Sequence, residues 1–300
     1  MTKGGSLLLQ LLLIVGCSQN PPVSPSSSSL QPSSAPTRYA AQLRGFVGAY
    51  DAKAAGIQFV LADVRGLRPP TVNDFGDLNW VTDRGPIEAV IDGLDTTQAG
   101  SVSTSILRTH AANLPIGTYR VTGIEYVSAA GESEQLSTGD VLVDVRPHTT
   151  GADAIEFWRY SVGQTRMAFI EMEIGNVAAS EITVRGLDFH LEGVTSRMYR
   201  ATAPDASQEP GMPQPGPELT EVTEVELAPG DRVGLQFTLE MTSPAAEFTE
   251  LAPFLVIEGD GRQSVRPVPL QTYFTVSGDE APILDYVRTL PASASHELHQ

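Results

Sequence analysis

Residues Arg232 to Met241 read Arg-Val-Gly-Leu-Gln-Phe-Thr-Leu-Glu-Met, which is the most regular stretch of the chain. Every second side chain in it is apolar: Val233, Leu235, Phe237, Leu239 and Met241. A repeat of two places these side chains on one face of an extended strand, whereas a helix would scatter them around its axis. The stretch therefore predicts a β-strand with one face in a hydrophobic core and with Phe237 buried at its centre.

The same alternation recurs along the chain, and it predicts further strands. These cover residues 42–49, 57–64, 87–91, 102–107, 140–146, 167–174 and 254–258. Turn-forming combinations of Pro, Gly and Asp separate several of them, and no convincing apolar run at helical spacing competes before residue 278. Parallel α/β folds need long crossover connections, usually helices, and these are missing. We therefore predict an all-β fold built of antiparallel β-sandwiches.

Two of the predicted strands change face at a glycine. The parity of the apolar residues shifts by one across Gly123, and it shifts again across Gly186. A one-residue slip turns every following side chain to the other face of a sheet, so each glycine predicts a β-bulge or a bend. The alternative is that each region holds two shorter strands.

The N-terminal residues have the pattern of an export signal. Lys3 supplies a positive charge, and Leu7–Val15 is an apolar run that is too short to span a bilayer, which takes about 20 residues. The run ends in Ile14-Val15-Gly16-Cys17, which resembles the lipobox of bacterial lipoproteins. The resemblance implies cleavage before Cys17, diacylation through its thiol and acylation of its new amine. An ordinary secretory signal with a chance cysteine is the alternative.

Composition divides the rest of the chain. Residues 18–37 contain eight serines and five prolines, and they lack the apolar side chains that would offset the entropy of ordering. The predicted organisation is a signal peptide at 1–16, a lipid-anchored Ser/Pro-rich linker at 17–38, β-sandwich domains at 39–147 and 153–277, and a tail at 278–300. Ser18, rather than Asp, follows the cysteine, and resemblance to the sorting rules of diderm bacteria implies the outer membrane.

Three short motifs resemble parts of known surface modules. Leu114–Val121 is similar to a turn and strand of transthyretin-like sandwiches. Val225–Val233 and Glu173–Ala179 resemble corners of bacterial immunoglobulin-like adhesion modules. Each match covers fewer than ten residues. The resemblance implies two immunoglobulin-like β-sandwich domains, of the kind that act as spacers, adhesins or assembly parts without catalysing a reaction.

The charge and the cysteine count exclude several classes of protein. The chain has 19 Lys and Arg against 36 Asp and Glu, and a phosphate-binding surface needs clustered basic residues, so we expect no nucleic-acid partner. The single cysteine excludes intrachain disulfides and multi-cysteine metal sites. The sequence has no nucleophile elbow, phosphate loop or dinucleotide fingerprint, and it predicts no catalytic residue and no cofactor.

One loop is rich in oxygen ligands. Within Asn73–Asn79, the side chains of Asp74, Asp77 and Asn79 are weak candidates for a calcium site, because calcium takes six to eight oxygens from such loops. The spacing does not follow the EF-hand pattern, and an ordinary turn is the alternative.

Other side chains are candidates for binding. His190 lies two residues from both Asp188 and Glu192, so on a strand the three would share a face and could form a weak cation site. A solvated strand face is the alternative. Three aromatic residues can stack on sugars, although aromatic side chains are more often part of a core: Trp80, Trp158 and Tyr160.

Taken as a sequence, the chain is expected to be a non-enzymatic lipoprotein of the bacterial cell envelope, anchored through Cys17 and acting in binding, adhesion or surface assembly. Its expected partners are the membrane, through the lipid, and an envelope protein or a glycan. A glycan-binding module on the same anchor is one alternative, and a secreted hydrolase is another. The first needs an exposed aromatic platform, and the second needs a concave site with a perturbed catalytic residue.

Replacing Cys17 with Ser removes the thiol that would carry the lipid. We expect the variant to move from the membrane fraction to the soluble fraction, because acyl chains hold the parent in the bilayer. The measurements are cell fractionation and the intact mass of the mature parent. A variant that stays with the membrane, and a parent mass without acyl chains, would contradict the anchor.

Overall fold

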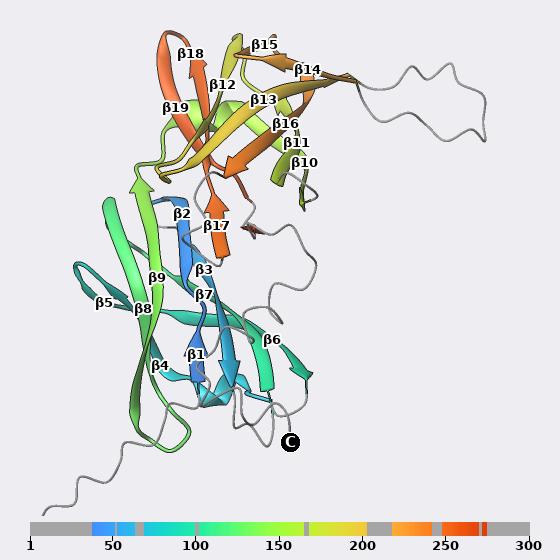
Figure 1. Ribbon diagram of the computed structural model, residues 1–300. Coiled ribbons are helices and arrows are strands. Elements are labelled where there is room, and N and C mark those ends of the chain that lie inside the picture. Colours follow the sequence, from blue (N-terminus) through green and yellow to red (C-terminus); the bar gives the residue numbers. More distant parts are fainter. Residues whose placement is uncertain are drawn as a thin grey trace, which may run out of the picture. The chain divides into compact units, whose positions relative to one another are not determined.

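The computed structural model describes residues 38–51, 53–63, 69–99, 102–164, 168–202, 218–241, 248–269 and 272–274. Apart from two short 3₁₀-helices, η1 (Val72–Asp74) and η2 (Thr150–Ala154), the regular elements in these ranges are β-strands (Figure 1). The predicted all-β fold is confirmed. No helix within the described ranges is long and apolar enough to cross a membrane.

The strands in these ranges form four sheets, of which two surround a first hydrophobic core. The first sheet contains, in spatial order, β1 (Arg38–Ala40), β3 (Ala55–Asp63), β7 (Val102–Ala111) and β6 (Val90–Ala99). The second contains β20 (Thr272–Phe274), β17 (Phe248–Ala252), β2 (Leu43–Tyr50), β9 (Ser133–Arg146), β8 (Gly117–Val127), β4 (Gly76–Thr82) and β5 (Gly85–Glu88).

The other two sheets surround a second hydrophobic core. The third sheet contains β10 (Ile155–Gln164), β11 (Ala168–Asn176), β16 (Arg232–Met241), β13 (Val194–Thr202) and β14 (Glu218–Val222). The fourth contains β15 (Val225–Leu227), β12 (Ile182–Asp188), β18 (Phe254–Gly259) and β19 (Arg262–Pro267).

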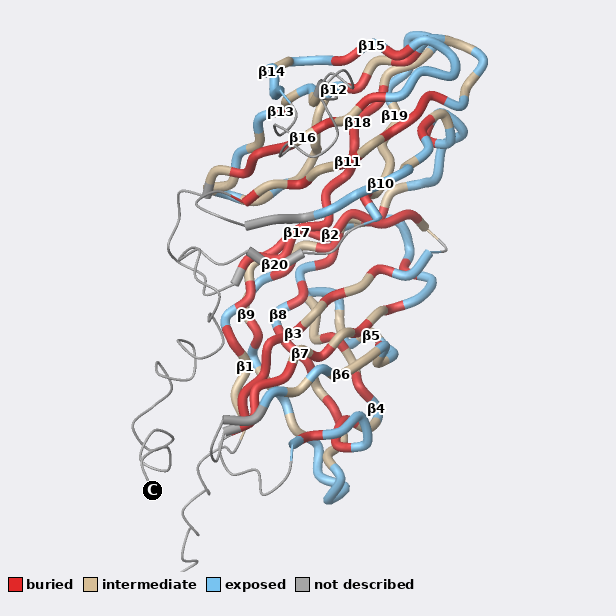
Figure 2. Tube along the Cα trace, turned by 90° about the vertical axis from the view of Figure 1, so that its right-hand side faces the viewer, coloured by how far each residue is buried: buried red, intermediate tan, exposed pale blue. Residues whose placement is uncertain are grey.

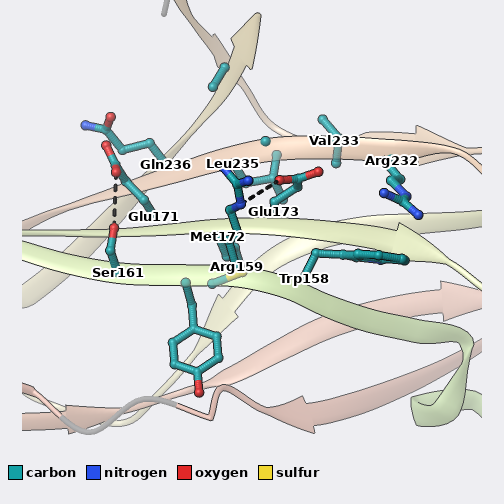
Figure 3. A pocket seen from close by; sticks show the side chains of 13 residues that line it. Trp158, Arg159, Ser161, Glu171, Met172, Glu173, Arg232, Val233, Leu235 and Gln236 are labelled. Carbon is teal, nitrogen blue, oxygen red and sulfur yellow. Dashed lines mark hydrogen bonds and ion pairs between the residues drawn. The ribbon is translucent and has the colours of Figure 1, made fainter. Parts of the chain in front are cut away.

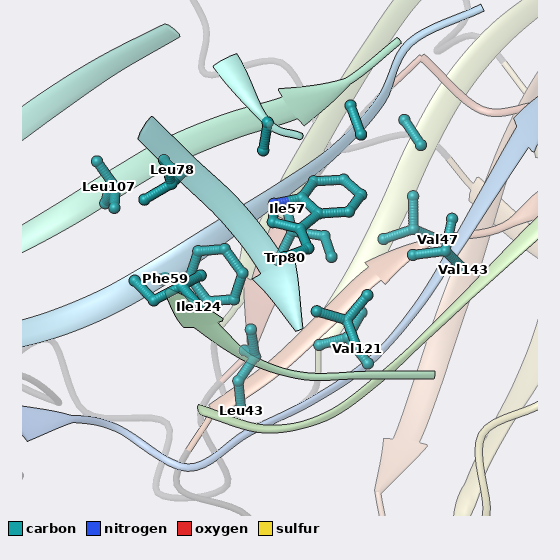
Figure 4. Close-up of a cluster of buried hydrophobic side chains, with 14 of the residues drawn as sticks. Leu43, Val47, Ile57, Phe59, Leu78, Trp80, Leu107, Val121, Ile124 and Val143 are labelled. Atoms are coloured by element: carbon teal, nitrogen blue, oxygen red, sulfur yellow. The ribbon is translucent and has the colours of Figure 1, made fainter. Parts of the chain in front are cut away.

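Trp80 of β4 is the largest side chain of the first core, and it is completely buried (Figure 4). Its Nε1 donates a hydrogen bond to Oγ1 of Thr109, 2.9 Å away. Thr109 Oγ1 in turn donates to the carbonyl oxygen of Ile57 at 3.0 Å. The indole N–H therefore has an acceptor, and burying this side chain leaves no donor without a partner.

The second core confirms the strand predicted from the period of two. On β16 the buried side chains include Val233, Leu235, Phe237 and Leu239, and Phe237 is completely buried. Glu240, of opposite parity to Phe237, instead reaches Arg197 on the neighbouring strand β13, with 3.1 Å between Oε1 and the guanidinium nitrogen. The strand thus has one face in the core and one polar face, as the alternation requires.

Strand β2 joins the two cores. Its Val47 belongs to the first core, while the preceding side chain, Phe46, points to the opposite face and belongs to the second core. It runs parallel to both of its neighbours, β9 and β17, so the prediction of purely antiparallel sheets is wrong for this sheet. Both β2 and β17 are mostly buried (Figure 2). Because β17 comes from residues 248–252, inside the range predicted as the second domain, the two predicted domain ranges share one sheet.

The strand register is irregular at both glycines that were predicted to mark β-bulges. Register shifts occur between Val121 and Gly123 and between Val184 and Gly186, inside continuous strands, so both predicted β-bulges are confirmed. Gly186 has φ of +128°, a conformation that favours glycine.

The single strand predicted at 87–91 is wrong. The chain leaves β5 at Glu88 and enters β6 at Val90, because it passes from one sheet to another there.

Glu250 of β17 is a completely buried carboxyl group. Its two oxygens lie 3.2 and 3.4 Å from the backbone nitrogen of Gln58 on β3, which donates to them. Burial raises the pKa of Glu250 well above its ordinary value, and the Gln58 N–H opposes this only in part. The folded protein therefore favours the protonated carboxyl group.

Replacing Glu250 with Gln should stabilise the protein increasingly as the pH rises. Above pH 4.5, the ordinary pKa, the unfolded chain loses the Glu250 proton while the folded chain keeps it. The stability that the raised pKa provides at low pH is thus lost as the pH approaches the folded pKa. In this interval the unfolding free energy of Glu250→Gln should gain about 1.4 kcal/mol per pH unit over that of the parent.

The measurement is urea unfolding at pH 5, 6.5 and 8. The control is Glu240→Gln, because Glu240 is half-exposed and paired with Arg197. Comparison with this variant separates the effect of burial from the effect of removing a carboxyl group. A Glu250→Gln difference that stays constant, or that shrinks toward pH 8, would show that the buried carboxyl group is ionised in the folded protein.

Candidate functional site

The third sheet carries a groove of about 870 Å³ on the face turned away from the second core. On β11, Ile170, Met172 and Ile174 face the core and are buried. Glu171 and Glu173 alternate with them, so they point to the opposite face and line the groove. Figure 3 shows the groove with Trp158 and Arg232 at one end and Ser161, Glu171 and Gln236 at the other.

A bulge places Trp158 in this groove. The register between β10 and β11 shifts between Phe157 and Arg159, which leaves Trp158 as the extra residue. Its indole covers Gly175 of β11, since a Cβ atom at that position would lie only 3.0 Å from the indole Nε1. Gly175 is buried for this reason, while the Trp158 side chain keeps 47% of its surface exposed. The bulge and the glycine together form the seat of the indole.

Arg232 stacks on the exposed tryptophan. It lies opposite Gly175 in the pairing of β16 with β11, and its Cζ is 3.3 Å from the centroid of the Trp158 ring. This is a close cation–π contact. Among the described residues, no carboxylate lies within ion-pair distance of Arg232. A guanidinium whose Cζ is this close to the ring centroid fits only when it lies nearly flat on the ring, because a tilted group would press its nitrogens into the ring atoms. Its in-plane N–H groups are therefore directed away from the indole.

Polar side chains project into the groove beside the backbone and apolar residues that also line it. Nε of Arg159 lies 3.9 Å from Oε2 of Glu173, and the Arg159 side chain is 87% exposed. Ser161 Oγ donates to Oε2 of Glu171 at 3.2 Å. With Gln236, these side chains present donors and acceptors around one exposed aromatic ring, which is the kind of lining that orients a small polar ligand.

The three candidate aromatic residues do not form one stacking surface, although Trp158 and Tyr160 both line the groove. Trp80 has no exposed surface and lies in the first core, so only its alternative role as a core residue holds. Trp158 and Tyr160 are each 47% exposed on β10. Tyr160 pairs with Met172 and so shares its core-facing side, whereas Trp158 lies over Gly175 on the outer side. The bulge separates two residues that simple alternation would place on one face.

The candidate calcium ligands lie at the end of η1 and in the first half of β4, so they belong neither to a calcium loop nor to a simple turn. Oδ2 of Asp74 accepts hydrogen bonds from the backbone N–H of Thr71 at 2.6 Å and from its hydroxyl at 3.0 Å, which caps η1. Asn79 Nδ2 donates to the carbonyl oxygen of Asp77 at 3.2 Å, and Asp77 has φ of +44°. Within the described ranges, no three His, Cys, Asp or Glu side chains are grouped as a metal ion would need.

The arrangement predicted around His190 also differs. Strand β12 ends at Asp188, so Asp188, His190 and Glu192 do not share a strand face. Asp188 pairs with Arg146 at 2.7 Å. The His190 ring makes a T-shaped contact with the Phe46 ring, with 6.2 Å between the ring centroids. Cys17, the predicted lipidation site, lies outside the described residues, as do the predicted signal, linker positions 17–37 and tail.

Comparison with known proteins gives no family. No family model matches the chain, and no match was found among curated proteins. Similar solved structures include a DUF4785 family protein from Legionella pneumophila, 13% identical with a TM-score of 0.22, over 80% of this chain and 56% of that one. The secreted serine protease VesC from Vibrio cholerae is 8% identical with a TM-score of 0.20, over 76% and 49%. The chain thus spans about half the length of these structures, and such low scores carry no argument.

Proposed function

We propose that the chain is a non-enzymatic lipoprotein of the bacterial envelope that binds a glycan in the groove of the third sheet. The observation that supports this most is the exposed indole of Trp158, seated on Gly175 among polar side chains. The flat apolar face of an aromatic ring packs against the C–H face of a sugar. Carboxylate, amide and hydroxyl groups nearby can bond to the sugar hydroxyls.

The polar surroundings favour a glycan over a protein partner. A protein interface normally has a central apolar patch with a polar rim. On this face Trp158 is instead flanked by Arg159, Glu173 and Arg232, all charged. An exposed ring with charged side chains around it suits a ligand that offers both a C–H face and hydroxyl groups, as a sugar does. Adhesion or assembly through an envelope protein is the alternative, and Trp158 would then act as an interface anchor.

The proposed placement follows from the N-terminal sequence. Cleavage before Cys17 and acylation would anchor the chain, and the linker at 17–38 would hold the folded part away from the membrane. The folded part would consist of two immunoglobulin-like β-sandwich domains, 39–147 and 153–277, with β17 of the second range completing a sheet of the first. Each range contributes most of one hydrophobic core, although Phe46 of the first range lies in the second core and Ala252 of the second range lies in the first. The groove would be displayed at the cell surface.

Trp158→Ala should weaken glycan binding at least about tenfold, which corresponds to about 1.4 kcal/mol, because the stacking surface is removed. The measurement is a glycan array with the full chain in detergent, followed by calorimetry with the saccharides that bind. Ile116→Ala is the matched control, since Ile116 is 55% exposed and lies outside the groove. It should bind as the parent does. A parent that binds no saccharide, or a Trp158→Ala variant with full affinity, would contradict the proposal.

A further inference from the structure

Arg232 is a cation that the described part of the chain leaves without an anionic partner. Three of the seven described arginines in the range 153–277 have a carboxylate within ion-pair distance. Arg200, Arg232, Arg262 and Arg266 do not, and of these four Arg232 is the one that lines the groove. Arg185 pairs with Glu224 and Glu258, and Arg197 pairs with Glu240. Arg232 is exposed, and its guanidinium instead makes a cation–π contact with the ring of Trp158.

We propose that the glycan carries a carboxylate, as a uronic acid does, and that Arg232 binds this carboxylate at the Trp158 end of the groove. This inference rests on the proposed function. A guanidinium presents its N–H donors in the plane of the group, and two of them match the two oxygens of a carboxylate. The Trp158 ring covers the face of Arg232 and leaves these in-plane donors for a ligand. Stacking also reduces the side-chain freedom that binding would otherwise remove.

No acidic side chain on the neighbouring strand neutralises Arg232. Glu173 of β11 lies opposite Gly234, two positions along β16 from the pair formed by Gly175 and Arg232. Its ion-pair contact is with Arg159, at 3.9 Å. Arg232 and Glu173 thus line the same groove without pairing. Arg232 covers one face of the indole. A sugar that packs against the remaining exposed surface of Trp158 can therefore place a carboxylate against the N–H groups of Arg232 and hydroxyl groups against Glu173.

The same carboxylates limit how much negative charge the ligand can bring. Glu171 and Glu173 lie along the groove away from Arg232, and a second or third anionic group of the ligand would meet them. The negative charges of the ligand and of these two carboxylates would repel each other. The groove therefore suits a saccharide with an isolated carboxylate, and it disfavours a densely sulfated or phosphorylated polymer.

The test compares each uronic acid oligosaccharide with its carboxyl-reduced form, in which CH₂OH replaces the carboxylate and the rest is unchanged. The full chain in detergent is titrated with both. We expect the parent to bind the acid form at least about tenfold more tightly. Arg232→Gln should bind both forms equally, at the parent's affinity for the reduced form. Arg232→Lys should keep part of the preference, because a lysine is a point charge without the planar fork.

Arg262→Gln is the control. Arg262 of β19 is exposed and lies outside the groove, so the preference for the acid form should be unchanged. Equal binding of the two forms by the parent, or an unchanged preference in Arg232→Gln, would overturn this inference and leave glycan binding intact. Tighter binding of sulfated or phosphorylated saccharides than of uronic ones would overturn it as well. If no saccharide binds the parent, the proposed function fails, and this inference fails with it.

Discussion

The pairing of strand β2 with β17 is the constraint on which the rest of the structure depends. β2 lies between two hydrophobic cores and contributes to both, with Val47 on one side and Phe46 on the other. Gly48 makes this possible, because a Cβ atom there would lie 2.7 Å from the ring of Phe254. Phe254 opens β18, only two residues after β17 ends. The second core is thereby packed directly against a strand of the first.

Polar contacts also hold the second sheet against the fourth. Arg146, at the end of β9, pairs with Asp144 on its own strand and with Asp188 at the end of β12, and its guanidinium lies over the ring of Phe254. These contacts connect the second sheet to the fourth. With one face of the third sheet covered by the second core, the opposite face is left for the groove. Trp158 lies on this opposite face, where the bulge in β10 places it.

The strands were largely predictable, because one face of each is buried and a period of two records this in the sequence. The bulges at Gly123 and Gly186 were predictable for the same reason: the apolar parity changes there, and Gly186 adopts a positive φ. The break at Ala89 was not, since a chain that passes between sheets can keep its alternation. Strand β17 was not predictable either, because its pairing with β2 joins residues that are far apart in the sequence. Its central residue, Glu250, is also of a type that normally faces solvent, although it is buried here.

The candidate site was predicted only in part. The sequence singled out Trp158 as an aromatic residue, but the bulge that turns it away from Tyr160 contains no glycine to indicate it. Arg232 was seen only as an outward-facing residue of the most regular strand. Its meeting with Trp158 depends on the register of three strands, which no local pattern contains. Gly175 was the one local signal, since a glycine inside a strand often marks a close approach.

The central claim is that the two cores unfold together because they share β2, and the chain's two tryptophans allow a direct test. In a Trp158→Phe variant, the fluorescence of Trp80 reports on the first core alone, while far-UV circular dichroism reports on all the strands. Both are followed through urea unfolding of the same sample. The account predicts one transition with the same midpoint by both probes. Two separated transitions, with Trp80 following only one of them, would show that the cores fold independently and would contradict it.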